Sequence, residues 1–590
     1  MRNRTALPIA LVLAASPVLA QHIAVGRNVQ VSSAHENDTH YEVLVAADPN
    51  NASRLVVGSF RYPAGTMESG TVVYASRDGG KTWQPTLKGD VLANTSDPAP
   101  AYGPDGTAYY TASSLGPAGT PREARKMLLF RSSDGGMAWE GPTQFTYSDR
   151  QYITVDATGG KYHGRLYVNG NNRVPYGISD FVVFRSLDKG TTWQGPGTRE
   201  GFGKHSAGMM GNAVIASDGT LIGLFEEKDN LRAITSVDGG ASLTPAVDID
   251  TGYVEAGNRK GTNNNVTTLP IIAIDAGKGP RRDNVYAVWA DRRTGRGRIF
   301  LASSSDKGRT WSKSRPIDDS PATDSSDNFM PSVAVNNDGV VGVMWYDRRE
   351  HADNIGWDVR FTASSDGGKT FLPSAMVSER GTTFGEKARY TSLRASSARP
   401  AAAVGGVTVL LTLNNFVFLG GDTAGLVADA TGVFHPVWVD SRTGIPQVWT
   451  APVGVGRKAP QIRAGSDDRS PSVDVSDRVM IDVVDATFDR GSRTVSAAVQ
   501  LRNTSQVAVR GPFTVRLREI TSDIGELRAA DNDWTFSNLA LEPGAVSSPK
   551  TWTFVISGIQ PFRSGNRYRT GLVKLNAVVL GSPVTPSQRP

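Results

Sequence analysis

The sequence predicts an all-β protein: a seven-bladed β-propeller, with six blades as the alternative, followed by a C-terminal immunoglobulin- or fibronectin-like β-sandwich. Three observations predict this fold. A short motif returns six times at intervals of roughly 50–70 residues, which is a spacing typical of propeller blades. Short alternating apolar runs lie between its copies, and Gly-Gly and Asp-Gly turn signals recur in a chain with 63 Gly and no Cys.

The first 20 residues are predicted to be a signal peptide. Arg2 and Arg4 make a positive start, Ala6–Ala15 is mostly apolar, and Val18-Leu19-Ala20 offers small residues for cleavage before Gln21. A membrane anchor is the weaker alternative, because a bilayer span takes ~20 apolar residues. We therefore expect a secreted or periplasmic chain, cleaved after Ala20, without an integral membrane segment.

The repeated motif reads Ser-x-Asp-x-Gly-x-x-Trp in its clearest copy, Ser76–Trp83. Ser and Asp side chains accept hydrogen bonds from backbone N–H groups a few residues further on, and the second Gly permits a positive φ. The aromatic residue then returns to the sheet and fills apolar space between blades. We expect a structural turn with no catalytic role at the six Asp positions: Asp78, Asp134, Asp188, Asp238, Asp306 and Asp366.

The units between the motifs define the domains. The unit that begins at Pro331 contains four predicted strands, and its motif, Ser364–Phe371, lies between the third and the fourth. A last unit, Gly425–Pro452, lacks the motif and has three strands, so Ile23–Ser33 is expected to supply its fourth strand and close the ring. The predicted domains are a propeller over 21–455, a linker over 456–476 and a sandwich over 477–590.

Composition excludes several functions. The net charge of +6 is weak for 590 residues and no Lys/Arg run occurs, so no nucleic-acid partner is expected. No Cys is present and the seven His are scattered, so the sequence predicts no metal site and no cofactor. Calcium at Asp318-Asp319 or Asp324–Asp327 is the alternative, although a solvated loop fits these residues better. The sequence gives no indication of oligomeric state.

Candidate chemistry lies on the side of the ring opposite the repeated motif, where the loops after the second strands meet the starts of the innermost strands. These loops and strand starts are rich in carboxylates and arginines. Arginine suits recognition of a carboxylate, sulfate or phosphate, and paired acids suit general acid–base work on a glycosidic bond. The candidate catalytic residues are Asp291, Asp347, Asp440, Glu226 and Tyr390. The candidate substrate-binding residues are Arg61, Arg150, Arg293, Arg349 and Arg442.

A structural role is the alternative for three of these loops. Each has the pattern Trp-x-Asp-x-Arg, led by Trp289, Trp345 or Trp438. An Asp and an Arg two residues apart can pair with each other and tie neighbouring blades together, and such ion pairs imitate functional sites.

The motif copies and their units resemble the Asp-box (BNR-repeat) sialidase superfamily over about Gln21 to Pro452, and more narrowly the bacterial exo-α-sialidase-like proteins. Phe60-Arg61-Tyr62-Pro63 resembles the family motif whose Arg binds the sialic-acid carboxylate. Tyr390-Thr-Ser-Leu393 resembles the setting of its nucleophilic Tyr. The resemblance therefore implies a glycoside hydrolase that acts on acidic glycans, with a glycan or glycoconjugate as partner.

Two other functions stay open. One is a non-catalytic propeller that binds glycan or protein at the same mouth. The other is a polysaccharide lyase, which would need a Tyr or His base beside an Arg that neutralises a uronate. The pairing of the arginines separates these hypotheses: arginines that converge with a free carboxylate favour hydrolysis, whereas arginines that each pair with an Asp favour binding or a scaffold.

Overall fold

The computed structural model describes most of the chain in two units, Met1–Ile462 and Arg463–Pro590. The described residues are 22–63, 70–87, 92–117, 120–172, 180–197, 207–252, 269–321, 323–351, 356–382, 393–397, 409–413, 420–443, 445–456, 473–474, 478–489, 494–521, 526–529, 533–536, 540–557 and 574–581. The predicted signal peptide, most of the predicted linker and Tyr390 lie outside these ranges. Among the described residues, no helix is both long and apolar enough to cross a membrane.

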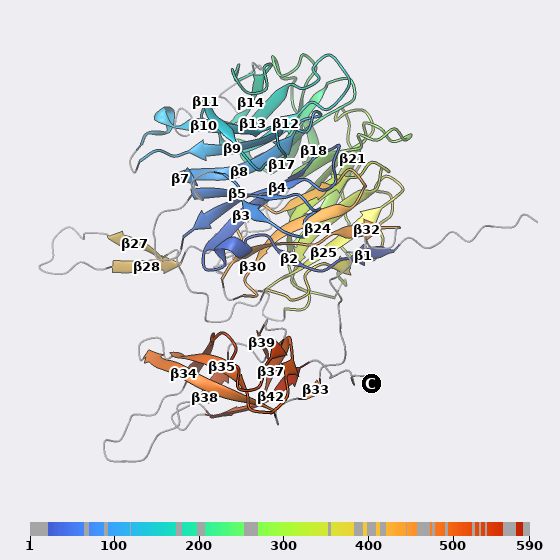
Figure 1. Ribbon diagram of the computed structural model, residues 1–590. Coiled ribbons are helices and arrows are strands. Elements are labelled where there is room, and N and C mark those ends of the chain that lie inside the picture. The colour runs from blue at the N-terminus through green and yellow to red at the C-terminus, as the bar shows by residue number, and fades with distance from the viewer. Residues whose placement is uncertain are drawn as a thin grey trace, which may run out of the picture. The chain divides into compact units, whose positions relative to one another are not determined.

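Unit 1 is built from antiparallel sheets that follow one another in chain order (Figure 1). Six of them are the β3 sheet, β8 sheet, β12 sheet, β15 sheet, β19 sheet and β23 sheet, each named after its first strand. The β3 sheet has β3 (Thr39–Ala47), β4 (Leu55–Tyr62), β5 (Gly70–Ser76), β6 (Gln84–Pro85) and β7 (Leu92–Ala93), the β8 sheet has β8 (Thr95–Tyr102), β9 (Ala108–Ser114), β10 (Lys126–Ser132) and β11 (Glu140–Thr146), and the β12 sheet has β12 (Asp149–Val155), β13 (Leu166–Asn172) and β14 (Asp180–Ser186). The β15 sheet has β15 (Ala207–Ile215), β16 (Leu221–Glu227), β17 (Asn230–Ser236) and β18 (Val247–Thr251), and the β19 sheet has β19 (Ile271–Ile274), β20 (Val285–Asp291), β21 (Arg298–Ser304) and β22 (Arg315–Pro316). The β23 sheet has β23 (Asn328–Val335), β24 (Val341–Asp347), β25 (Asp358–Ser364) and β26 (Ala375–Met376).

A further sheet joins the two ends of unit 1. It contains β29 (Gly425–Ala428), β30 (Phe434–Asp440), β31 (Gln447–Thr450) and β32 (Val453–Val455) from the end of the unit, with β1 (Ile23–Val25) and β2 (Val29–Gln30) from its beginning. Strand β2 pairs with β31, which confirms that Ile23–Ser33 supplies the outer strand of the last unit. Outside these sheets lie the hairpin β27 (Leu393–Ser397) and β28 (Val409–Leu413) and two 3-10 turns, η1 (Ser33–His35) and η2 (Arg122–Ala124).

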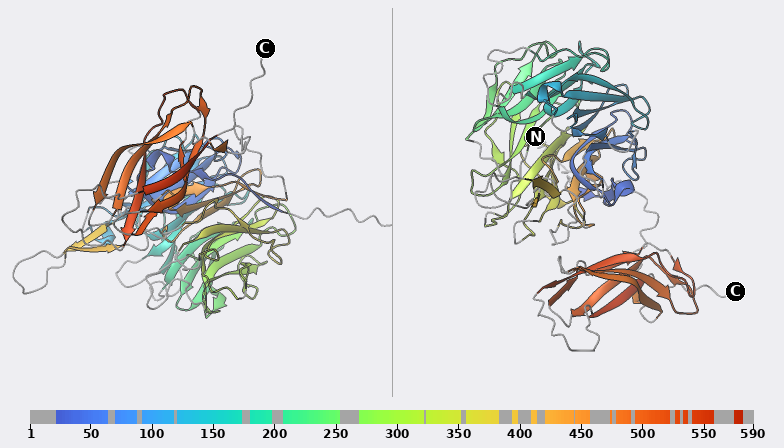
Figure 2. Two further views of the ribbon diagram at one scale, coloured as in Figure 1. Left: turned by 90° about the horizontal axis from the view of Figure 1, so that it is seen from below. Right: turned by 90° about the vertical axis from the view of Figure 1, so that its left-hand side faces the viewer.

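The first strands of the sheets form a closed ring. Strand β3 contacts β8, β8 contacts β12, and the succession continues through β15, β19, β23 and β29, which contacts β3 again. The ring is visible as the colour order from blue through green and yellow to orange in Figure 2 (right). A ring of antiparallel sheets around a shared axis is a propeller-like, all-β fold.

All six Asp-box turns have the predicted hydrogen bonds. In the first, Gly80 N–H donates to Ser76 Oγ at 2.9 Å, and the N–H groups of Lys81 and Thr82 donate to Asp78 Oδ1 at 3.0 and 2.9 Å. Gly80 has a φ of 86°, which favours glycine. The aromatic residue is also placed as predicted: Trp83 packs with Val437 and other apolar residues of the preceding sheet. The first box is therefore a turn within its own sheet whose aromatic residue packs against the neighbouring sheet.

A second set of contacts connects five of the six boxes to the first hairpin turn of the preceding sheet. In three of these boxes the residue after the box Asp is Gly, and an arginine lies against it or donates to the box backbone. In the other two that residue is Lys, and the lysine pairs with an Asp. The arginine contacts are Arg54 with Gly135, Arg165 with Gly239 and Arg281 with Ser365; the lysine pairs are Lys189 with Asp105 and Lys307 with Asp218. The Gly or Lys in these five boxes thus matches the side chain that the neighbouring sheet presents.

Unit 2 contains two four-stranded antiparallel sheets and a short strand pair. One sheet has β33 (Val473–Asp474), β37 (Phe513–Thr521), β39 (Asp533–Phe536) and β42 (Lys574–Gly581). The other has β34 (Val479–Asp489), β35 (Thr494–Asn503), β38 (Glu526–Ala529) and β41 (Lys550–Ser557); β36 (Val509–Arg510) pairs with β40 (Ala540–Leu541). One apolar cluster contains residues of both sheets, and the rings of Trp534 and Trp552 stack in it with centroids 4.2 Å apart.

Candidate functional site

Four of the innermost strands share a β-bulge where they begin. The pairing register shifts at this point in β3, β8, β12 and β23, and one non-glycine residue of each bulge has a positive φ: Glu42 at 49°, Asp97 at 53°, Arg150 at 53° and Met330 at 52°. A bulge redirects a side chain, and a non-glycine residue in the left-handed region is uncommon enough to suggest a functional constraint. Because the strands of each sheet alternate in direction, these bulges lie on the side of the ring opposite the Asp-boxes.

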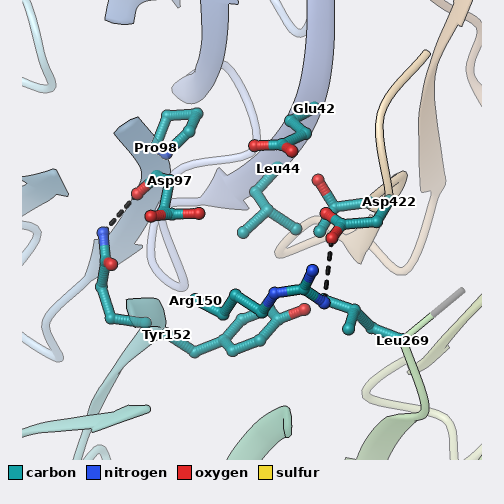
Figure 3. A pocket seen from close by; sticks show the side chains of 10 residues that line it. Glu42, Leu44, Asp97, Pro98, Arg150, Tyr152, Leu269 and Asp422 are labelled. Atoms are coloured by element: carbon teal, nitrogen blue, oxygen red, sulfur yellow. Dashed lines mark hydrogen bonds and ion pairs between the residues drawn. The ribbon is translucent and has the colours of Figure 1, made fainter. Parts of the chain in front are cut away.

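Side chains from five of the innermost strands or their preceding residues line one pocket, which we name the central pocket. Its empty volume is about 270 Å³. It is lined by Glu42, Leu44, Asp97, Pro98, Arg150, Gln151, Tyr152, Leu269, Asp422 and Thr423. Figure 3 shows three carboxyl groups, from Glu42, Asp97 and Asp422, pointing into the same space from different parts of the chain. Leu44, Pro98 and Leu269 add apolar wall to this acidic centre.

One cation balances the acidic group. The guanidinium Nη1 of Arg150 lies 3.1 Å from Asp422 Oδ2, and both side chains are largely buried. Burial alone would lower the pKa of Arg150, but the negative charges of Asp422, Asp149, Asp97 and Glu42 outweigh it and raise that pKa. Arg150 is thus permanently charged and directs its charge at Asp422.

The three carboxyl groups hold their protons more tightly than ordinary side chains. Burial, followed by the charges of Asp422 and Asp97, raises the pKa of Glu42 well above its usual range. Burial and the charge of Asp149 raise the pKa of Asp97 to about 7. Burial also raises the pKa of Asp422, while its ion pair with Arg150 opposes that rise. The proton therefore belongs on Glu42, and the negative charge belongs on Asp422 beside the arginine.

The backbone holds the two acids against each other. Glu42 N–H donates to the carbonyl of Gly420 at 2.7 Å, which ties the bulge of β3 to the segment just before β29. Gly421 has a φ of 87°, and a Cβ there would lie 2.3 Å from Cγ of Glu42. Glycine is therefore required for Asp422 to approach Glu42 this closely.

Below the central pocket the ring encloses an axial channel. It shares Leu44 and Tyr152 with the central pocket and has an empty volume of about 570 Å³. The channel is lined by Leu44, Val45, Ala99, Pro100, Tyr152, Ile153, Thr154, Asn212, Ile271, Ser332, Val333, Gly425 and Leu426. All the innermost strands of the ring contribute to it, so the central pocket is the opening of the ring axis at this end.

Three stacked aromatic rings lie next to the acids. Tyr41 precedes Glu42 on β3, and its ring stacks on Phe60 and Tyr62 with centroids 4.5 and 5.5 Å apart. Burial and the neighbouring Tyr62 hydroxyl raise the pKa of Tyr41. Tyr62 is only partly buried. This stack packs beside the bulge of β3 and supports the position of Glu42.

The three Trp-x-Asp-x-Arg loops are ion-paired within themselves. Asp347 accepts hydrogen bonds from Trp345 Nε1 at 2.9 Å and from Arg349 Nε at 2.9 Å, and Arg349 also reaches Asp319 of the preceding sheet at 2.8 Å. The other two loops repeat this arrangement, with Asp291 and Arg293 reaching Asp250, and with Asp440 and Arg442 reaching Asn28. These contacts correspond to the structural alternative: each pair holds its own loop and a neighbouring segment.

The other predicted site residues are separated from one another. Arg61 Nε pairs with Asp38 at 2.5 Å. Glu226 lies at the end of β16, where its carboxylate faces Gly208. Tyr390 lies outside the described residues. Of the five predicted substrate-binding arginines, Arg150 is the one that lines the central pocket.

Of the charged and aromatic residues in the central pocket, sequence reasoning selected Arg150 but not Glu42, Asp97, Tyr152 or Asp422. A signal for Asp97 was present. Asp97-Pro98 and Met330-Pro331 occupy the same position in their repeats, immediately before the buried part of the strand, and this is also the position of Glu42. Aligning the repeats on that position would have grouped Asp97 with Glu42.

The acidic loops named for calcium have protein partners. Asp318 accepts from Arg298, Asp319 from Arg349 and Ser374, and Asp324 from Ser326. Among the described residues, no group of three or more His, Cys, Asp or Glu side chains has the geometry to hold a metal ion.

Comparison with known proteins gives limited information. No family model matches the chain, and no curated protein matches it at a significant level. Among solved structures, the chain is similar to the Hadza microbial sialidase Hz136 at 17% identity, covering 60% of this chain and 68% of that chain with a TM-score of 0.39. It is also similar to the Trypanosoma rangeli sialidase solved with the inhibitor DANA (12% identity, 93% and 92% covered, TM-score 0.38). A third is an α-L-arabinofuranosidase from Fusarium graminearum (14% identity, 61% and 93% covered, TM-score 0.35). Similarity at these levels carries no conclusion about the substrate or reaction of this chain.

Proposed function

We propose that this protein is an exported glycoside hydrolase whose active site is the central pocket. The observation that carries the proposal is the convergence of Glu42, Asp97 and Asp422 with Arg150 at one end of the ring axis. Burying several carboxyl groups in one place is costly for a folded chain, and their raised pKa values are the expected consequence. Such clusters in a cleft mark functional sites more often than structural ones when no other role accounts for them.

Glycoside hydrolysis needs two carboxyl groups in different protonation states, and we propose Glu42 and Asp422 for these two roles. One carboxyl group must protonate the leaving oxygen, and a second must be ionised to attack the sugar or to activate water. Glu42, which keeps its proton, suits the general acid, and Asp422, whose charge is balanced by Arg150, suits the base or nucleophile. Asp97, with a pKa of about 7, adds a third group that changes charge near neutral pH.

The narrower hypothesis of an exo-α-sialidase acting on acidic glycans has less support. It requires cations that are available to a substrate carboxylate. Arg150 is paired with Asp422, Arg61 with Asp38, and the remaining predicted arginines with their own loop acids. We therefore propose the glycoside hydrolase class. The sialoside in the assay below tests the narrower sialidase hypothesis.

The lyase alternative has one favourable feature and one unfavourable one. Tyr152 lies beside Arg150 in the central pocket, which is the required pair of residue types. However, burial and the charge of Asp422 raise the pKa of Tyr152 well above its usual range, so its hydroxyl is a poor base.

We also propose the finer features of the architecture. The closed ring of seven innermost strands supports a seven-bladed propeller over 21–455, and the shared core of the two sheets in unit 2 supports an immunoglobulin- or fibronectin-like sandwich over 477–590. Export through a signal peptide cleaved after Ala20, into the periplasm or the medium, completes the proposal.

The test is turnover of a panel of fluorogenic glycosides by the chain from residue 21 onward. The panel contains neutral pentosides and hexosides together with a sialoside. If a substrate is found, Glu42→Gln and Asp422→Asn should each lower kcat by about 10²–10⁴-fold without loss of fold. Glu140→Gln, at an exposed ion pair with Arg131, is the matched control and should leave kcat unchanged. Binding of a glycan without turnover would favour the non-catalytic propeller, and a product carrying an unsaturated uronate would favour the lyase.

A further inference from the structure

Tyr152 carries a buried hydroxyl that has no hydrogen-bond partner among the described residues. Its side chain is 6% exposed and lines the central pocket with Arg150 and Asp422. Figure 3 shows its ring beneath the guanidinium of Arg150, with the hydroxyl on the same side as Asp422. Buried polar groups are nearly always paired, because a hydroxyl that leaves water without a new partner destabilises the folded chain.

Two other buried tyrosines in the ring, Tyr346 and Tyr74, have partners. The hydroxyl of Tyr346 accepts the N–H of Val439 at 2.9 Å, and the hydroxyl of Tyr74 lies 2.7 Å from Nε2 of His40. The hydroxyls of Tyr110, Tyr167 and Tyr286 lack a partner among the described residues, as the Tyr152 hydroxyl does, but of these four tyrosines it is Tyr152 that lines the central pocket. A phenylalanine would fill the place of Tyr152 without the cost of an unpaired hydroxyl. The described residues of the chain therefore provide no hydrogen-bond partner for the hydroxyl of Tyr152.

Two polar side chains that line the axial channel below Tyr152, Asn212 and Thr154, have partners within the ring. Asn212 donates its side-chain amide to the carbonyl of Ile272 and accepts the N–H of the same residue, each at 2.9 Å. Thr154 Oγ1 donates to the carbonyl of Ala213 at 2.8 Å. These channel groups hold neighbouring strands together. A ligand that meets Tyr152 therefore sits on the central-pocket side, next to the acids.

We propose that Tyr152 is a ligand-binding residue whose hydroxyl donates a hydrogen bond to an oxygen of a neutral sugar ring seated in the central pocket beside Glu42 and Asp422. The proposal rests on the proposed function and names its substrate class. The carboxyl groups accept hydrogen bonds from sugar hydroxyls, Tyr152 donates one in return, and Leu44 and Leu269 provide apolar wall for a ring face. A substrate carboxylate placed here would face three acids.

The test uses Tyr152→Phe, which removes the hydroxyl and nothing else. Without ligand, its melting temperature should equal or exceed that of the wild type, because an unpaired buried hydroxyl is lost. Its KM for the best neutral glycoside of the panel should rise about tenfold, as for one lost hydrogen bond, with a smaller change in kcat. Tyr346→Phe is the control: it loses a hydrogen bond to Val439, so its melting temperature should fall while KM stays the same.

Failure of the inference is distinguishable from failure of the proposed function. If the wild type hydrolyses no glycoside, the proposed function fails, and calorimetric titration with D-galactose, D-glucose, L-arabinose and N-acetylneuraminic acid then tests Tyr152. Binding of a neutral sugar that weakens in Tyr152→Phe supports the inference. It is overturned if Tyr152→Phe is less stable than the wild type without ligand, if its affinity or KM is unchanged, if no sugar binds, or if only N-acetylneuraminic acid binds.

Discussion

Replacing Arg150 by methionine should lower the free energy of unfolding, and this loss should increase with pH. Arg150 Nη1 lies 3.1 Å from Asp422 Oδ2, and Glu42, Asp97 and Asp149 also act on its charge. Breaking a largely buried ion pair costs about 3–5 kcal/mol when the remaining charge stays ionised. Here Asp422 has an alternative, because it can take up a proton and remain buried as a neutral acid.

The sign of the pH dependence follows from proton linkage. Removing the guanidinium raises the folded-state pKa of Asp422 further above the value of about 4 in the unfolded chain. The folded chain then binds a proton that the unfolded chain has lost, so stability falls as pH rises above about 4, by up to about 1.4 kcal/mol per pH unit for each such group. The difference between the variant and the wild type should therefore be small near pH 4 and approach the full cost of the broken pair once the pH exceeds the raised pKa.

Urea unfolding at several pH values between about 4 and 8 measures this difference. Arg131→Met is a suitable control, because Arg131 pairs with Glu140 on the exposed surface and should matter by less than about 1 kcal/mol at every pH. A destabilisation by Arg150→Met that is equal at all pH values would refute the reasoning, since it would show that loss of packing rather than charge is responsible.

Two further predictions concern the Asp-boxes. Gly190→Ala should lower the free energy of unfolding by about 2–5 kcal/mol, because its φ of 87° strains an alanine and the added Cβ would meet Leu129 Cδ2 at 2.0 Å. Gly295→Ala, where φ is 94° and the surrounding space is open, should lower it by only about 1–2 kcal/mol. Equal losses in urea unfolding would show that the contact between sheets is unimportant. Hydrogen bonds from Thr370 hold the pKa of Asp366 at about 2 despite the opposing effect of burial, so the stability that its carboxylate contributes is present at neutral pH and is lost as pH falls from about 4 to about 2. The gap in melting temperature between the wild type and Asp366→Asn should close over that range, and a gap that persists at the acid end would contradict the assignment.

Features that depend on local chemistry were predictable from the sequence. The Asp-box turn is determined by residues within eight positions of one another, and Ser76, Asp78 and Gly80 have the hydrogen bonds and the positive φ expected of them. The pairing of β2 with β31 was predictable for a different reason, because a three-stranded last unit leaves an edge that the start of the chain can cover.

The candidate site was only partly predictable, because its convergence depends on ring closure. Glu42 and Asp422 are far apart in the sequence and meet only because β29 returns to β3. Sequence reasoning gave more weight to Asp347 and its equivalents, which stand out through their Trp-x-Asp-x-Arg repetition. That repetition reflects a structural role that each sheet needs, whereas the acids of the central pocket differ from repeat to repeat. Asp97 was missed for this reason.

The most direct test of the account compares two acid-to-amide variants in the same glycosidase assay. The account predicts that Glu42→Gln, in the central pocket, loses at least about 10²-fold in kcat while keeping the melting temperature of the wild type or exceeding it. It predicts the reverse for Asp347→Asn, whose carboxylate binds Trp345 and Arg349: a lower melting temperature with kcat preserved in the fraction that remains folded. Full activity in Glu42→Gln, or loss of kcat in folded Asp347→Asn, would contradict the assignment of the active site to the central pocket.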